Sequence, residues 1–166
     1  QAANGPLSRS PIAPTAPRGR LIRREPGFGT DGNNCHQERA VKRMKSNLYW
    51  MLGLVLLVWL VEIVNLSMGY QLNEWGILPR SSRGLVGIPV SPFLHGGIGH
   101  VISNTSGFVL LGSVVMMRGR MLFLQLSLLI VLLGGGLTWA LGRSAHHVGA
   151  SGLIFGYFGY LLARGW

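Results

Sequence analysis

The chain has 166 residues, 48% of them hydrophobic, and a formal net charge of +10. This length suits one domain, and the apolar residues gather in long blocks, which favours a membrane protein over a soluble one. The positive charge does not indicate nucleic-acid binding. Residues 1–47 hold nine Lys/Arg against three Asp/Glu directly before the first apolar block, and no basic stripe interleaved with aromatic residues follows.

Residues 1–46 are polar, basic and rich in proline, and they offer little that could build a core. We expect a disordered cytosolic tail. Its basic end, RAVKRMK, is expected to anchor the first span on the cytosolic side or to touch anionic lipid headgroups. No secretory signal is visible. The single cysteine, Cys35, lies in this tail as a free thiol, because it has no internal partner.

Four apolar segments follow, and each is predicted to span the bilayer as a helix. They cover about residues 48–66, 100–117, 121–141 and 151–163. Between the first two, residues 67–92 are too polar to span and too apolar for a plain solvent loop, so we expect short helices partly in the membrane interface. The expected fold class is therefore an all-α, polytopic membrane helix bundle.

The distribution of basic residues orients these spans. With the tail in the cytosol, Arg118 and Arg120 after the second span and Arg164 after the fourth also lie inside, and Arg143 is the exception. Glu62, near the far end of the first span, is expected to snorkel or to pair there. Four histidines lie toward the outer membrane face: His95, His100, His146 and His147.

His100 and Asn104 open the second span and are four residues apart, so they share one face of a helix. Both side chains can donate hydrogen bonds. An unpaired amide at this depth costs about a few kcal/mol, so such groups usually face the protein interior or a wet cavity. An interhelical hydrogen bond from Asn104 to a neighbouring backbone explains the pattern equally well.

GASG, residues 149–152, opens the fourth span. A serine between glycines at a helix N-terminus is well placed to be a nucleophile, because free N–H groups and the positive end of the helix dipole suit a developing oxyanion. A helix-capping role for Ser151 is the alternative. Gly152 and Gly156 form a Gly-x-x-x-Gly pair, which indicates that this helix packs tightly inside the bundle.

HGGIGHVISN, residues 95–104, and HVGASGLIFGYFGYLLARG, residues 147–165, together resemble the rhomboid intramembrane serine proteases. The resemblance covers roughly residues 48–166 and implies that four of six core transmembrane helices are present. It implies that Ser151 is the nucleophile and that His100 and Asn104 stabilise the oxyanion, with backbone N–H groups near Ser151.

The same resemblance gives four further residues supporting roles. They are Gly149 and Gly152 of the Gly-x-Ser-Gly motif, His95, which supports the loop and helix, and His147, which helps to set the loop entering the site. His146 and His147 are weak substitutes for a catalytic base. A metal site built from the four outer histidines is a further alternative. It lacks nearby Asp, Glu or Cys, so no metal and no cofactor are expected.

A Ser-His dyad needs a histidine base, which the resemblance assigns to the last core helix. No residue here matches it, so we expect the chain to be truncated at its C-terminus, possessing residues 47–166 of a partial rhomboid domain, and inactive as given. The expected function is endopeptidase cleavage of transmembrane-helix substrates near the outer face of a bacterial plasma membrane. The alternative is an inactive rhomboid-like protein that binds transmembrane helices. Transmembrane proteins and the lipid bilayer are the expected partners.

Overall fold

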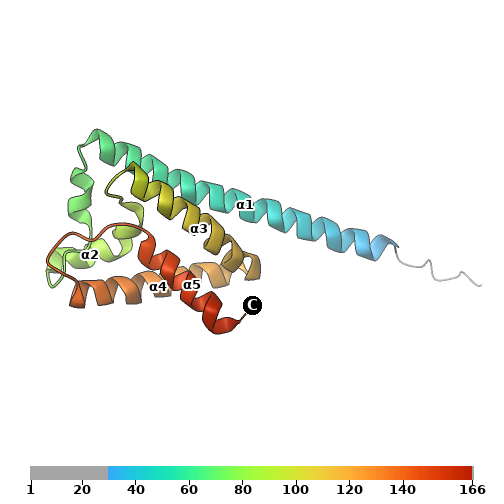
Figure 1. Cartoon of the computed structure of the whole chain (residues 1–166). Coiled ribbons are helices and arrows are strands. Elements are labelled where there is room, and N and C mark those ends of the chain that lie inside the picture. Colours follow the sequence, from blue (N-terminus) through green and yellow to red (C-terminus); the bar gives the residue numbers. More distant parts are fainter. Residues whose placement is uncertain (1–29, 166) are drawn as a thin grey trace, which may run out of the picture.

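The computed structural model describes the backbone of residues 30–165, and its side chains from residue 35. The expected all-α architecture is confirmed, and the described residues contain no strand beyond one isolated bridge. Figure 1 shows the arrangement of the helices, which are α1 (Thr30–Ser67), η1 (Gln71–Trp75), α2 (Ser82–Val90), η2 (Ser91–Phe93), α3 (Ile98–Arg118), α4 (Arg120–Leu141) and α5 (Ser151–Arg164).

Helix α1 begins far earlier than the first predicted span. Residues 30–46, expected as part of a disordered tail, are helical and continue into the apolar run without a break. They contain no proline, and Glu38, Ala40, Lys42, Met44 and their neighbours are good helix formers. At 1.5 Å per residue the 38-residue helix is about 57 Å long, so its N-terminal half extends beyond the other helices (Figure 1). The rest of the predicted tail, residues 1–29, lies outside the described residues.

Three helices of the described chain are long and apolar enough to cross a membrane: the part of α1 from Cys35 to Ser67, α3 and α4. They contain the predicted spans 48–66, 100–117 and 121–141. The fourth predicted span coincides with α5, which has 14 residues and is about 21 Å long. That is shorter than the roughly 20 residues needed to cross the hydrocarbon core.

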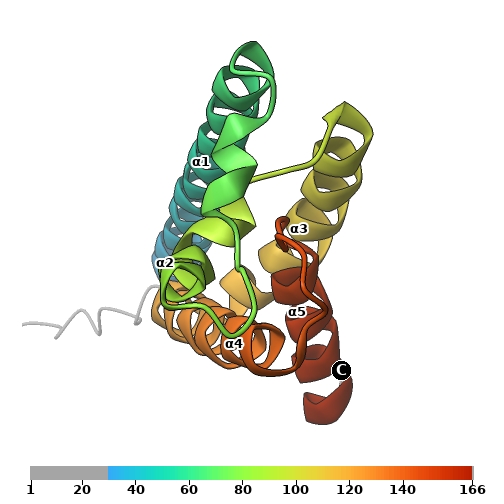
Figure 2. The ribbon, with the colours of Figure 1, turned by 90° about the vertical axis from the view of Figure 1, so that its left-hand side faces the viewer.

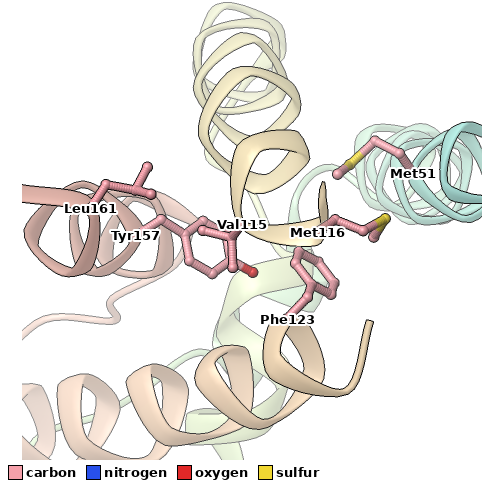
Figure 3. Packing of buried hydrophobic residues seen from close by; sticks show 6 residues of the cluster. All are labelled: Met51, Val115, Met116, Phe123, Tyr157 and Leu161. Carbon is pink, nitrogen blue, oxygen red and sulfur yellow. The ribbon is translucent and has the colours of Figure 1, made fainter. Parts of the chain in front are cut away.

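The core lies where α1, α3, α4 and α5 meet. Figure 3 shows its six buried side chains, which are Met51, Val115, Met116, Phe123, Tyr157 and Leu161. The Tyr157 hydroxyl shares a hydrogen bond with Ser127 of α4 at 2.5 Å. Small residues permit this packing, since a Cβ on Gly112 would lie 3.4 Å from the Met51 methyl group. Most remaining large side chains of α1 and α4 are apolar and exposed, as expected of a surface that faces lipid.

The segment between α1 and α3 forms the short helices η1, α2 and η2, as expected, whereas its depth in the membrane remains a prediction. It lies at the opposite end of the bundle from the α3–α4 turn (Figure 1, Figure 2). Arg80 joins this segment to the C-terminus of α4 by donating to the carbonyl oxygens of Gly142 (3.0 Å) and Ala140 (3.4 Å). The Trp139 indole donates in the other direction, to the carbonyl of Ser81 (2.8 Å).

The same segment also holds the loop that leads into α5. Ile77 and His147 exchange two backbone hydrogen bonds of 3.0 and 2.9 Å, which form the isolated antiparallel bridge. The loop is therefore fixed at two points, Gly142 and His147, before it reaches residues 149–152.

Candidate active site

Helix α3 presents two donors from its first turns. Gly97, with φ +148°, precedes the helix, and His100 and Asn104 follow one turn apart on the same face. His100 is half-buried and Asn104 is 7% exposed. Within residues 35–165 the Asn104 Nδ2 atom has no hydrogen-bond partner. The predicted interhelical bond from this amide is therefore absent there, and the donor is free for another acceptor.

Gly149 brings the GASG loop against both donors. Its φ of +114° lies where L-residues are strained, and its N–H donates to the carbonyl of Ser91 at 2.9 Å. A Cβ built on Gly149 would lie 2.7 Å from His100 Nε2 and 3.2 Å from Asn104 Nδ2. Glycine is therefore required at this position for two reasons, the backbone conformation and the close approach of the two side chains.

Ser151 is the first residue of α5, two residues after this contact. The capping position is held by Ala150, and the helix has no side-chain capping hydrogen bond, so the alternative of a capping serine is wrong. The serine is half-buried. It stands at a helix N-terminus, where unpaired backbone N–H groups and the dipole favour negative charge.

The tautomer of His100 follows from its one hydrogen bond. The Gly96 N–H donates to His100 Nδ1 at 3.4 Å, a long contact. A neutral imidazole that accepts at Nδ1 carries its proton on Nε2, and Nε2 is the nitrogen nearest to Gly149. His100 and Asn104 thus both direct an N–H group at the loop that leads into Ser151.

Comparison with known proteins identifies this arrangement. The family model described as the Rhomboid domain matches residues 83–166, which include α3, α4, α5 and the GASG loop. The chain belongs to the rhomboid family. Three relatives resemble it over most of its length: uncharacterized protein Rv1337 of Mycobacterium tuberculosis and Mb1372 of Mycobacterium bovis, each 36% identical over 121 residues, and ML1171 of Mycobacterium leprae, 31% identical over 137 residues.

These matches cover 69 to 72% of the chain and 50 to 55% of the relatives. The chain therefore spans about half the length of the curated relatives that it matches. No solved structure matches it.

His95 lies behind His100 in this rhomboid site and is fully buried. The two imidazole rings meet edge to face, with centroids 5.1 Å apart. Burial, with a smaller contribution from the charge of His100, lowers the pKa of His95 to about 4. Because the pKa lies well below 7, the ring is neutral at physiological pH. Neither ring nitrogen has a hydrogen-bond partner among the described residues.

A clamp from α1 holds the backbone at His95, and sequence reasoning did not find it. The carbonyl of His95 accepts hydrogen bonds from the side-chain amides of Asn65 (3.2 Å) and Asn73 (3.1 Å), and Asn65 also donates to Asn73 Oδ1 (2.9 Å). Asn65 is fully buried near the end of α1. The available signal was a lone asparagine in an apolar run, three residues after Glu62.

Glu62 does not snorkel as expected. Its side chain is 2% exposed, and neither carboxylate oxygen has a partner within the described part of the chain. The side chain therefore points into the rhomboid bundle rather than toward the membrane surface.

The remaining histidines lie away from this chemistry. His147 forms the bridge to Ile77, and its Nε2 contacts the carbonyl of Arg143 at 3.1 Å, while His146 is exposed. In the described residues no group of three or more His, Cys, Asp or Glu side chains is arranged to hold a metal ion. The four-histidine metal site thus finds no support.

The two glycines that follow Gly149 behave differently from it. A Cβ on Gly156 would lie 2.4 Å from Ile130 of α4, so this glycine permits close helix packing. A Cβ on Gly152 would meet nothing within 4 Å. Phe155 is 72% exposed, so α5 presents one open face and is not at the centre of the described bundle.

A cavity of about 310 Å³ lies between α1, α3, α4 and α5, beneath η2. Its wall is mostly apolar, with Phe108, Phe123 and Leu153 among its members. Asn104 and His95 also line it, so the buried amide faces an open space rather than a packed neighbour.

Proposed function

We propose that this rhomboid-family chain is the N-terminal part of an intramembrane serine endopeptidase. Ser151 is the nucleophile, and His100, Asn104 and backbone N–H groups near Ser151 stabilise the oxyanion. The observation that carries this proposal is the contact of Gly149 with His100 Nε2 and Asn104 Nδ2. The Asn104 amide is buried without a partner in the described residues, as a donor reserved for a transient acceptor would be.

The reaction proceeds in two halves. A histidine base takes the proton of the Ser151 hydroxyl as its oxygen attacks the scissile carbonyl, and the negative charge on that carbonyl oxygen is stabilised by the two side-chain donors. The base then gives the proton to the leaving amine, and an acyl-enzyme remains. A water molecule, deprotonated by the same base, hydrolyses the acyl-enzyme and restores the serine.

The base is proposed to come from a further segment of the full-length protein. The matched relatives are about twice as long as the matched region, which leaves room for such a segment. The two hydrogen-bonded histidine rings of the described residues, His100 and His147, both contact backbone groups. The 166-residue chain is therefore not expected to turn over substrate by itself.

The proposed substrates are transmembrane proteins that unfold locally at the site. A hydrogen-bonded helix shields its carbonyl groups, so the cleaved stretch must leave the helical conformation before Ser151 can attack. With the N-terminus of α1 in the cytosol, the positive-inside rule puts the site toward the outer face of the plasma membrane.

Covalent labelling tests the proposal. The full-length protein, reconstituted in liposomes, is incubated with a fluorophosphonate and with a transmembrane reporter, and both are analysed by mass spectrometry. We expect one phosphonylated residue, Ser151, and reporter cleavage near the outer membrane face. Binding of the reporter with neither labelling nor cleavage would favour an inactive rhomboid-like protein instead.

Asn104→Leu is expected to lower kcat by about 10²–10³-fold, because one oxyanion donor is lost while the side-chain volume is nearly kept. The melting temperature is expected to be unchanged or higher, since the Asn104 amide has no partner among residues 35–165 that the substitution would break. Steady-state kinetics and thermal unfolding in detergent measure the two effects. Ser106→Ala is the control, because the Ser106 hydroxyl is exposed and bonds only within α3, to Ile102.

A further inference from the structure

Glu62 is the one carboxylate buried inside the described bundle. It lies on α1, five residues before the helix ends, and is 2% exposed. Neither oxygen has a hydrogen-bond partner in the described part of the chain. A carboxyl group buried in a membrane helix without partners costs free energy, so its presence requires an explanation other than stability.

The surroundings of Glu62 point to His100. The neighbouring amide of Asn65 is already committed to Asn73 and to the carbonyl of His95. The charge of Glu62 acts on His100, which approaches it from α3. His95, the other imidazole of this cluster, is held neutral by burial and carries no competing charge. The loop before α5 adds only the backbone of Gly149 to this contact.

We propose that Glu62 is a positioning residue for His100, supplying negative charge from α1 behind the imidazole that faces the oxyanion. The proposal rests on the proposed protease function and deepens it, because it gives α1 a part in a site otherwise built from α3 and α5.

The physical basis is the stabilisation of a donor by a carboxylate behind it. A carboxylate beside an imidazole orients the ring and stabilises the positive charge that develops on it. A hydrogen bond from a positively charged donor is about twice as strong as one from a neutral donor. The resting contact of His100 Nδ1 with Gly96 is 3.4 Å long, so little is lost when the ring responds to the oxyanion.

Substitution of Glu62 in the full-length protein tests the assignment. Glu62→Gln keeps the shape and removes the charge, and it is expected to lower kcat about 10–100-fold with KM changed less than about twofold. Its melting temperature is expected to equal or exceed that of the unsubstituted protein, because a buried charge without a partner is removed. Glu62→Asp keeps the charge and is expected to recover much of the lost kcat.

Met51→Ala is the matched control on the same helix. Met51 is 3% exposed in the hydrophobic core, away from the site, so its truncation is expected to lower the melting temperature and leave kcat nearly unchanged. If Glu62→Gln instead lowers the melting temperature and spares kcat, Glu62 has only a structural role and the proposal is wrong.

A spectroscopic measurement separates this proposal from the protease assignment. The side-chain nitrogens of ¹⁵N-labelled His100 are expected to shift between the unsubstituted protein and Glu62→Gln at the same pH, whether or not a substrate is cleaved. Unchanged His100 signals would overturn the coupling while leaving Ser151 chemistry intact. Absence of proteolysis together with shifted signals would overturn the protease function while leaving the coupling intact.

Discussion

Ser151→Ala is expected to abolish hydrolysis, with kcat lowered by about 10⁴-fold or more. Removal of a nucleophilic serine leaves only the catalysis that the oxyanion donors and substrate binding provide, and losses near 10⁶-fold occur in serine hydrolases. Folding should be unaffected, because the Ser151 side chain makes no capping hydrogen bond. Reporter cleavage in liposomes and fluorophosphonate labelling measure the effect.

Ser103→Ala is the matched control for this substitution. Ser103 is an exposed serine of α3, one residue before Asn104, and its replacement should leave kcat and labelling within about twofold, as for most surface changes. Persistent labelling of the Ser151→Ala protein would assign the nucleophile to another residue and remove the basis of the proposed mechanism.

Gly149→Ala is expected to lower kcat by about 10²-fold or more and to destabilise the fold by about 1–3 kcal/mol. The new Cβ would be 2.7 Å from the His100 ring, and the φ of +114° is strained for alanine. The loop must therefore retreat from His100 and Asn104, which separates Ser151 from its donors. Kinetics and thermal unfolding of the same preparation measure both effects.

Gly159→Ala provides the comparison within α5. A Cβ at Gly159 meets no atom within 4 Å among the described residues, and alanine is the better helix former. The melting temperature should hold or rise, and kcat should stay within about twofold. An equal loss of activity in both variants would mean that α5 tolerates no alanine at all, and the specific contact at Gly149 would lose its significance.

The proximity of His100, Asn104 and Gly149 was accessible from sequence because each motif begins a helix at the same end of the bundle. The i, i+4 spacing fixed the shared face of the two donors, and the predicted span 100–117 differs from α3 by two residues at the start and one at the end. The glycine before Ser151 suggested close backbone approach. The structure adds the partners, which periodicity cannot supply.

The role of α1 could not be predicted. Asn65 reaches the carbonyl of His95, 30 residues away, and a lone asparagine in an apolar run has many partners that are equally plausible from sequence. Glu62 was expected at the membrane surface because a carboxylate near a helix end usually extends there. Its inward direction depends on how α1 is rotated against α3, which only tertiary packing decides.

The two errors in α1 and α5 have similar causes. Composition separates residues 30–46 from the apolar run, but helix propensity continues through them, so the helix does not stop where polarity changes. Gly152 and Gly156 were treated as one packing motif, whereas only Gly156 faces Ile130. A spacing of four residues shows that two glycines share a face and does not show which neighbour that face meets.

The contacts that assemble the site join early segments to late ones: Asn65 to His95, Ile77 to His147, and Ser91 to Gly149. A nascent chain emerges from the ribosome in sequence order, so α1, α3 and α4 are made before the loop that brings the serine to its donors. A half-synthesised chain therefore holds no competent centre. Proteins entering the bilayer beside it are safe from premature cutting until α5 arrives.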